Sequence, residues 1–404
     1  MDDRSTDIAV LGGGLAGGLI ALALARLRPE LRVVVIERGD QLGGNHVWSF
    51  FATDLPEGGT ALVEPLIAAR WDDYEVRFPI GRRHLPTPYH SITSARLDSV
   101  VRNALPADAV LCGCEIADVT ANHITLGDGR TIAAGAVIDA RGSAGLPHMA
   151  GGWQKFLGQL IRTSTPHGLE RPIVMDGTVA QHDGYRFVYC LPFSVNEVFV
   201  EDTYYADGPE VDAQLLRDRI GAYCAEAGWQ VAEILGEESG CLPVVGSGDW
   251  KAFRAEHEMP GIALAGVRAG LLHPLTGYSF PLALAFALDL ARQRDVSGSA
   301  LTAWSQAWAA RHWQNGGFYR MLTKMLFATA TPDLRYVVLQ RFYRLNNALI
   351  ERFYAGKSTL LDRLRVLTGK PPVPFFKAIA TVMGEPALNP LTLPERPPQA
   401  GPPR

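Results

Sequence analysis

Short apolar runs alternate with glycine-rich and polar segments along the first forty residues. Residues 8–11 are apolar, residues 19–25 form a longer apolar segment, and residues 33–36 form another short run. A glycine-rich turn joins the first run to the second. Strand, tight turn, helix and strand within roughly thirty residues is the order of a βαβ unit, so we predict one here.

The turn between the first strand and the helix has the spacing of a dinucleotide-binding loop. It reads Gly12-Gly13-Gly14-Leu15-Ala16-Gly17, and all of these except Gly13 are candidate cofactor contacts. We assign Gly12 to the tight turn, Gly14 to close approach of a pyrophosphate, and Gly17 to packing of the helix on the strand. Glu37 ends the second strand, where it can accept a hydrogen bond from a ribose hydroxyl. The motif predicts an adenine dinucleotide without distinguishing NAD from FAD.

Further turns suited to a cofactor follow other predicted strands. A polar glycine turn holds Gly44 and Asn45, and the buried strand predicted at 136–140 leads into Arg141 and Gly142. A helix is predicted over 92–105, with Thr93 or Ser94 as its cap and Arg96 in its first turn. A last buried strand at 261–266 leads to a helix at 282–291 through the turn Thr276-Gly277-Tyr278. A strand, a turn and a helix N-terminus again form an anion or cofactor cradle.

The pattern of residue types along the chain predicts four parts. Residues 1–150 together with 256–295 form a discontinuous dinucleotide-binding domain. Residues 151–255 alternate in the manner of β-strands, with a helix near 213–227, and form an inserted sheet domain over the cofactor. Residues 296–385 are helical. Residues 386–404 contain seven prolines in nineteen residues, so this tail is expected to be disordered.

Composition and charge narrow the class of protein. A hydrophobic content of 47% with 20% charged residues is typical of a globular protein. The five cysteines give neither a pairing framework nor a metal motif, and we expect no metal site. We also expect no signal peptide and no membrane-spanning helix.

The basic residues gather near the C-terminus. Residues 311–377 hold twelve Lys or Arg against three acids, a local balance of +9, among many aromatic residues. This combination favours an anionic membrane surface, with a solvated helical face as the alternative. Nucleic acid is not expected, because the fold signals indicate a small-molecule enzyme. The oligomeric state is not predicted.

The spread of cofactor turns over 290 residues resembles the FAD-dependent group of the glutathione-reductase/aromatic-hydroxylase type, an α/β fold with a Rossmann-like FAD domain. In that group a first-turn arginine such as Arg96 touches FAD, and a late Gly-Asp turn contacts the ribityl chain. Here Gly266 is followed by Val267 and Arg268, so backbone amides near 276–278 would carry more of the binding.

Several longer strings resemble the bacterial lycopene β-cyclase family over residues 7–383. They are Gly44-Asn45-His46-Val47-Trp48-Ser49-Phe50, 74–79, 166–169, 184–189, Phe199-Val200-Glu201-Asp202-Thr203, 273–279 and 352–357. The resemblance implies a non-redox isomerase that closes β-ionone rings on lycopene, giving γ-carotene and then β-carotene. It also implies reduced FAD, with NAD(P)H as the electron donor, and peripheral attachment to the cytoplasmic face of the membrane.

Ring closure needs a carboxylic acid that stays protonated in an apolar pocket. On an extended strand Phe199, Glu201 and Thr203 share one face, and the resemblance places the family's essential glutamate at Glu201. Asp202 is a second catalytic candidate, although an arginine or backbone partner would also explain it. Asp176 is a further candidate for proton removal. Flavin, rather than Glu201, remains an alternative proton carrier.

Other side chains and other reactions also have to be considered. His273 lies in the turn expected near the flavin, and Tyr185, Phe187 and Tyr189 are candidates for the wall of a polyene channel. An FAD monooxygenase or reductase acting on an apolar substrate is the alternative enzyme. A non-catalytic flavin or carotenoid carrier is the third possibility.

Overall fold

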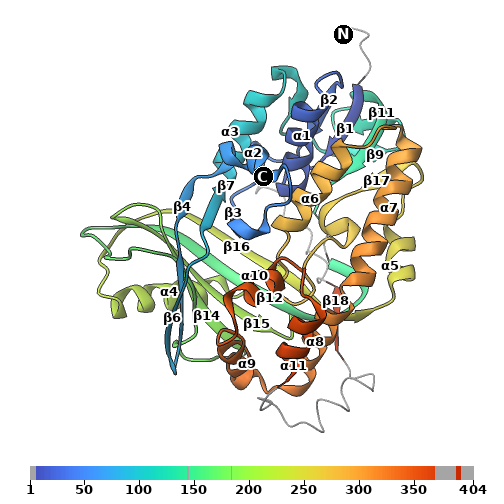
Figure 1. The fold of residues 1–404 in the computed structure, drawn as a ribbon. Coiled ribbons are helices and arrows are strands. Elements are labelled where there is room, and N and C mark those ends of the chain that lie inside the picture. Colours follow the sequence, from blue (N-terminus) through green and yellow to red (C-terminus); the bar gives the residue numbers. More distant parts are fainter. Residues whose placement is uncertain (1–5, 143–144, 183, 369–387, 393–404) are drawn as a thin grey trace, which may run out of the picture.

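The computed structural model describes residues 6–142, 145–182, 184–368 and 388–392 (Figure 1). Its first layer is a largely parallel sheet in the order β8-β2-β1-β11-β10-β9, with β17 beside β11. These strands are β1 (Thr6–Leu11), β2 (Val33–Ile36), β8 (Val110–Leu111), β9 (Ile116–Val119), β10 (His123–Leu126), β11 (Thr131–Asp139) and β17 (Ile262–Leu264). The predicted βαβ unit is confirmed, because β1 and β2 pair in parallel around the intervening helix.

Helices with buried apolar faces pack around this sheet. They are α1 (Leu15–Leu27), α3 (Ser94–Ala104), α6 (Phe280–Ala291) and α7 (Gly298–Asn315). α1 and α6 belong to the same buried cluster as the sheet, and burial of this apolar surface stabilises the layer. The predicted cap of α3 is confirmed, since the Thr93 hydroxyl accepts a hydrogen bond from the backbone N–H of Arg96.

A second, antiparallel-rich sheet lies below the first in Figure 1, in the order β16-β12-β15-β14-β13-β5-β6. Its strands are β5 (Tyr74–Phe78), β6 (Gly81–Leu85), β12 (Gly145–Thr163), β13 (Ile173–Asp176), β14 (Tyr185–Pro192), β15 (Glu197–Ala206) and β16 (Val231–Gly248). Helix α4 (Ala213–Glu226), predicted from the sequence, packs on one face. The sheet extends beyond the predicted 151–255, because β5 and β6 join it from the first part of the chain.

A three-stranded sheet in the order β3-β7-β4 lies beside these layers. Its strands are β3 (Val47–Phe51), β4 (Ala69–Trp71) and β7 (Tyr89–Thr93). The remaining helices are α2 (Gly59–Val63), α5 (Trp250–His257), α8 (Gly317–Thr329), α9 (Arg335–Phe342), α10 (Asn347–Tyr354) and α11 (Leu360–Leu367), with short 3-10 turns including η1 (Ala52–Asp54) and η4 (Gly266–Ala269). Helices α8 to α11 cluster at the end of the second sheet away from α1 (Figure 1).

The C-terminal part differs from expectation in one respect. The part of 296–385 that the structure describes ends at residue 368 and is helical in the main, while 369–385 lies outside the described residues. Within the predicted disordered tail, β18 (Asn389–Thr392) pairs with β12, and Leu391 is completely buried. Pro390 is compatible with this strand because proline is tolerated on a sheet edge. Residues 393–404 lie outside the described residues.

Candidate active site

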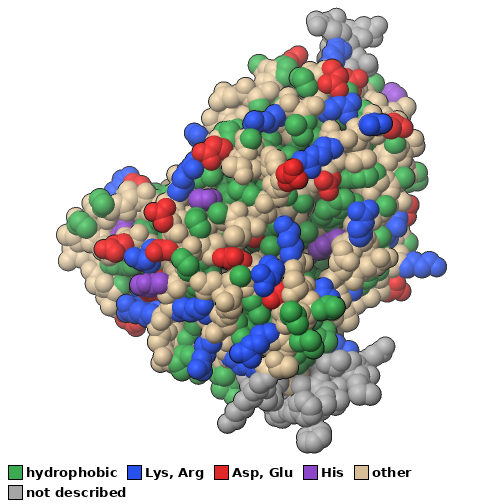
Figure 2. All heavy atoms as spheres, viewed as in Figure 1, with side chains coloured by type: hydrophobic (Ala, Val, Ile, Leu, Met, Phe, Trp, Pro, Cys, Tyr) green, Lys and Arg blue, Asp and Glu red, His purple; other side chains and the backbone are tan. Residues whose placement is uncertain are grey.

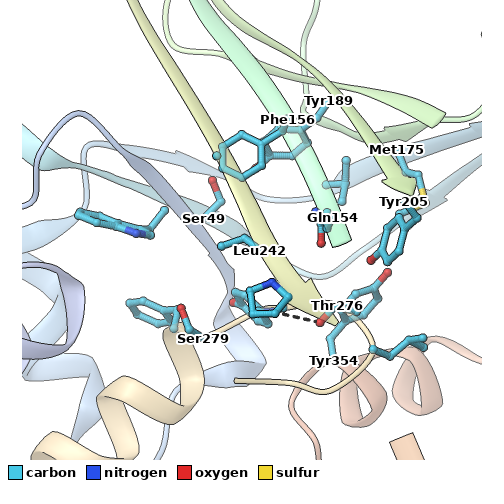
Figure 3. A pocket seen from close by; sticks show the side chains of 18 of the residues that line it. Ser49, Gln154, Phe156, Met175, Tyr189, Tyr205, Leu242, Thr276, Ser279 and Tyr354 are labelled. Carbon is cyan, nitrogen blue, oxygen red and sulfur yellow. Dashed lines mark hydrogen bonds between the residues drawn. The ribbon is translucent and has the colours of Figure 1, made fainter. Parts of the chain in front are cut away.

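A cavity of about 1000 Å³ lies between the two main sheets and the C-terminal helices. Residues of the glycine turn, β12, β15, β16, the loop before α6, and helices α8 to α11 line it. Figure 3 shows Phe156 and Tyr189 from the sheet on one side, and Thr276, Ser279 and Tyr354 on the other. The cavity therefore joins the predicted cofactor turn to the predicted substrate sheet.

The glycine turn is shaped by close backbone contacts. Gly12 has a φ of +91°, and a Cβ at Gly17 would lie 1.9 Å from the Gly12 carbonyl oxygen, so both positions require glycine. A Cβ at Gly14 would meet no atom of the described residues within 4 Å. Leu15 and Ala16 line the cavity with Gly14. The N-terminus of α1 therefore opens onto free space.

This opening fits the phosphates of a dinucleotide. Gly14 is the N-cap residue of α1 and has no side chain to satisfy the first N–H groups, which an anion can bind instead. Arg141 and Gly142 line the neighbouring wall, and Arg141 forms a 2.7 Å ion pair with the buried carboxylate of Asp139. The turn from Thr276 to Tyr278 lines the cavity beyond them.

The remaining predicted cofactor residues lie outside the cavity lining. Glu37 accepts hydrogen bonds from the backbone N–H groups of Gly13, at 2.7 Å, and Gly39, at 2.8 Å. Gly44 is exposed, and the Asn45 amide donates to the carbonyl of Glu237. Arg96 is exposed, and its Nε donates to the carbonyl of Pro65.

Glu201 lies on β15 with its side chain toward the cavity, on the face predicted from the sequence. The hydroxyl of Thr203 donates to Glu201 Oε1 at 2.5 Å, which confirms that the two residues share a face. Burial, and secondly the charge of Glu238, raise the pKa of Glu201 to about 8, against the weaker lowering effect of the Thr203 hydrogen bond. Both effects favour the protonated form of this carboxyl group.

The other predicted acids are placed elsewhere. Asp202 points to the opposite face of β15, where it is fully buried and forms a bidentate pair with Arg186 at 2.6 Å. Asp176 is also buried, and it accepts a hydrogen bond from Tyr223 of α4 at 2.9 Å. The structure does not bring Asp202 or Asp176 to the cavity.

Aromatic side chains form much of the cavity wall. They include Phe51, Tyr89, Phe156, Phe187, Tyr189, Tyr205, Phe342, Phe353 and Tyr354. Tyr89 and Tyr189 are joined by a 2.8 Å hydrogen bond between their hydroxyl groups. Tyr185, a third candidate from the sequence, is buried outside the lining. Such a wall excludes water and offers π faces to a cation.

Sequence reasoning missed two buried acids at this site. Glu238 of β16 lines the cavity, and its Oε2 accepts from the backbone N–H of Val47 at 3.2 Å and lies 3.0 Å from Nδ1 of His46. Asp54 accepts a 2.6 Å hydrogen bond from the cavity-lining Tyr278, and burial raises its pKa to about 6. Neither acid lies in a recognisable motif, so only the tertiary structure identifies them.

Three further expectations concern a metal site, a membrane-spanning helix and the position of His273. Among the described residues, no group of three or more His, Cys, Asp or Glu side chains could hold a metal ion. No helix in the described ranges has the length and apolarity needed to cross a bilayer. His273 is buried beside Tyr319. Its backbone N–H donates to the carbonyl of Tyr278, which closes the turn between the two residues.

Comparison with solved structures identifies the class of fold. A geranylgeranyl bacteriochlorophyll reductase-like protein from Thermoplasma acidophilum superposes with a TM-score of 0.57 at 13% identity, covering 91% of this chain and 97% of that one. The p-nitrophenol 4-monooxygenase of Pseudomonas putida DLL-E4 gives a TM-score of 0.56 at 14% identity, covering 90% and 97%. This chain therefore shares the fold of a reductase-like protein and of a monooxygenase, in agreement with the predicted fold class.

Sequence comparison identifies the family within this class. The family model described as lycopene cyclase protein matches residues 7–380. The lycopene β-cyclase of Pseudescherichia vulneris is 46% identical over 92% of this chain and 96% of its own length. The lycopene β-cyclase of Pantoea ananas is 44% identical, over 93% and 98%. This chain belongs to the lycopene cyclase family.

Proposed function

We propose that this protein acts as a lycopene β-cyclase, converting the open ψ-ends of lycopene to β-ionone rings by way of γ-carotene to β-carotene. The observation that carries the proposal is a neutral carboxylic acid, Glu201, in an aromatic-walled cavity that reaches a dinucleotide-binding turn. Family membership supports the same activity. The reaction moves protons and double bonds and leaves the molecular formula unchanged.

Glu201 is the residue that begins the reaction in this proposal. Its carboxyl group donates a proton to the terminal double bond of the substrate, which leaves a carbocation at the adjacent carbon. The next double bond attacks that carbon and closes the six-membered ring. Loss of a proton from the ring then forms the new double bond. Burial supports the first step because it keeps the acid protonated near neutral pH.

The walls of the cavity contribute to the later steps. Tyr89, Tyr189 and Tyr205 present aromatic rings to the same space as Glu201. A cation passing between these rings is attracted to their π faces and shielded from water, which would otherwise trap it as an alcohol. Asp202 contributes indirectly, because its pair with Arg186 holds the opposite face of the same strand.

The residues present fit FAD, the dinucleotide that this fold class binds. Gly14, Leu15 and Ala16 would hold the pyrophosphate, while Arg141, Gly142 and residues 276–278 would line the remainder of its length. Glu37 braces the turn through Gly13. When bound in its reduced, anionic form, with NAD(P)H as the electron source, the flavin supplies negative charge that stabilises the cation electrostatically.

We further propose that the protein docks peripherally on the cytoplasmic face of the membrane through α11. Four leucines of this helix are exposed, by 75% for Leu360, 78% for Leu361, 59% for Leu364 and 44% for Leu367. Arg363 and Arg365 lie among these leucines in the sequence. Figure 2 shows Lys and Arg side chains next to hydrophobic ones in this region. The cavity lining reaches Val366 and Leu367, so a polyene can pass between lipid and cavity.

Anaerobic conversion of lycopene tests the proposed function. Purified protein, FAD and dithionite are incubated with lycopene in liposomes, and the product is identified by mass and retention time. We expect β-carotene of unchanged mass, and E201Q should bind FAD normally while forming rings at least about 100-fold more slowly. A product altered in hydrogen or oxygen content would instead indicate a redox flavoenzyme.

A further inference from the structure

Strand β12 of the second sheet lies between two strands that each carry an acid at the same level. Gly158 of β12 lies opposite Glu201 of β15 on one side and opposite Glu238 of β16 on the other. Residues directly opposite one another in a sheet share a face, so both carboxyl groups stand on the face that lines the cavity. Their backbones are two strand spacings apart, about 10 Å.

The residue between the two acids, Gly158, carries no side chain, and an aromatic ring occupies the space above it. A Cβ at Gly158 would lie 2.2 Å from the ring of Phe199, so the absence of a side chain here leaves room for that ring. Phe199 is almost fully buried. The two acids therefore stand on either side of Gly158 and the buried ring of Phe199.

The surroundings of the two acids differ in the way that an acid and a base require. Glu201 is held by one hydroxyl group, that of Thr203. Glu238 receives a backbone N–H from Val47 and contacts the imidazole of His46, and such donors stabilise a carboxylate. The His46 side chain is 43% exposed, whereas that of Glu238 is 3% exposed. His46 thus connects the buried Glu238 to solvent.

We propose that Glu238 is the catalytic base that removes the proton from the newly closed ring, and that His46 passes this proton to water. The inference rests on the proposed function. The C–H bond at the ring carbon next to the polyene breaks, its electron pair forms the ring double bond, and the proton goes to the Glu238 carboxylate. Glu201 has lost one proton to the substrate and regains one from water, so that no proton is gained or lost overall.

Hydrogen isotope exchange distinguishes this role from a structural one. Lycopene is incubated anaerobically in D2O with FAD, dithionite and each variant, and both cyclised product and recovered lycopene are analysed by mass spectrometry. E238Q leaves the acid in place, so protonation and its reversal should introduce deuterium into recovered lycopene while β-ring formation falls about 100-fold or more. E201Q should introduce none.

The neighbouring Glu237 provides the matched control. Its side chain pairs with Arg217 and Gln159 on the other face of β16. E237Q should therefore cyclise lycopene at the wild-type rate. If circular dichroism finds E238Q unfolded, E238D replaces it, and slower ring formation with continued deuterium entry is the expected result.

Two results would overturn the inference while leaving the proposed function intact. One is ring formation by E238Q at the rate of E237Q. The other is a folded E238Q that introduces no deuterium, which would place Glu238 before the protonation step. If the wild-type protein itself leaves lycopene uncyclised, the proposed function fails and this inference fails with it.

Discussion

Glu201 is a carboxylic acid that the fold keeps in its neutral form. Removal from water is the largest effect on its pKa, and the negative charge of Glu238 acts in the same direction. The hydroxyl of Thr203 opposes both, because it donates to the ionised form. Burial therefore favours the proton-donating form of Glu201. It also means that ionisation of this side chain destabilises the folded state.

This cost predicts a dependence of stability on pH. The pKa of Glu201 rises from 4.5 to about 8 on folding. The contribution of this residue to the free energy of unfolding is therefore fully present below pH 4.5 and is lost as the pH rises through about 8. Gln does not titrate. We therefore expect the free energy of unfolding of E201Q, relative to the wild type, to increase from pH 5 to pH 8. Urea denaturation at both pH values measures it, and a constant difference would contradict the shifted pKa.

The two acids of the proposed mechanism differ in how far the sequence reveals them. Period-two alternation places Phe199, Glu201 and Thr203 on one face, and this pattern together with the family resemblance points to Glu201. Glu238 follows another glutamate in a strand without clear alternation. Its position opposite Glu201 depends on the register of both strands with β12, and register between distant strands is a tertiary property.

At the scale of elements, the glycines of the turn before α1 have separate tasks in the proposed phosphate-binding site. Gly17 lets the first turn of α1 approach the carbonyl of Gly12, and Gly14 leaves the helix end open. The first task is a matter of packing, which affects the folded state. The second concerns access by a ligand.

Paired alanine variants separate these tasks. G17A would force a methyl group against the Gly12 backbone, so we expect a loss of about 1–3 kcal/mol in the free energy of unfolding. G14A meets open space at an ordinary φ of −66°, so its stability should be close to wild type while its affinity for FAD falls. Thermal melts and flavin fluorescence titration measure the two effects. Equal destabilisation by both variants would contradict this division.

Element boundaries were predictable where the pattern was local. The strand, turn and helix near the N-terminus, the capped helix α3 and the helix α4 follow from neighbouring residues alone. The recruitment of β5 and β6 into the second sheet was not predictable, because β5 pairs in parallel with β13, about a hundred residues further along. Nor was β18, since the prolines around it favour irregular backbone.

At the scale of the whole molecule, one cavity runs from the N-terminal turn to the last helix of the C-terminal cluster. The exposed leucines of α11 stand at the latter end, beside basic residues. This arrangement suits a substrate that reaches the cavity from lipid at the α11 end and a cofactor that reaches it from water at the glycine turn. The two would enter from opposite ends of the same space.

Replacement of the exposed leucines by serine should weaken membrane binding without destabilising the folded protein. We expect L361S/L364S to lower partitioning onto anionic liposomes by about tenfold or more, with no change in Tm. V195S, at a 73% exposed position between β14 and β15, is the control and should bind as wild type. Sedimentation with liposomes at low and high salt measures both apolar and electrostatic parts. Unchanged binding by the double variant would exclude α11 as the docking element.

The short strand β18 has a consequence for how this protein behaves in solution. Strand β15 pairs with β12 from Trp153 onward, and β18 takes over on the segment from Gly145 to Gly151. Unpaired strand edges attract strands of other molecules. Truncation before Asn389 would uncover such an edge and the apolar surface beneath Leu391. A chain trimmed of its proline-rich end should therefore self-associate, unless the cut leaves residues 389–392 in place.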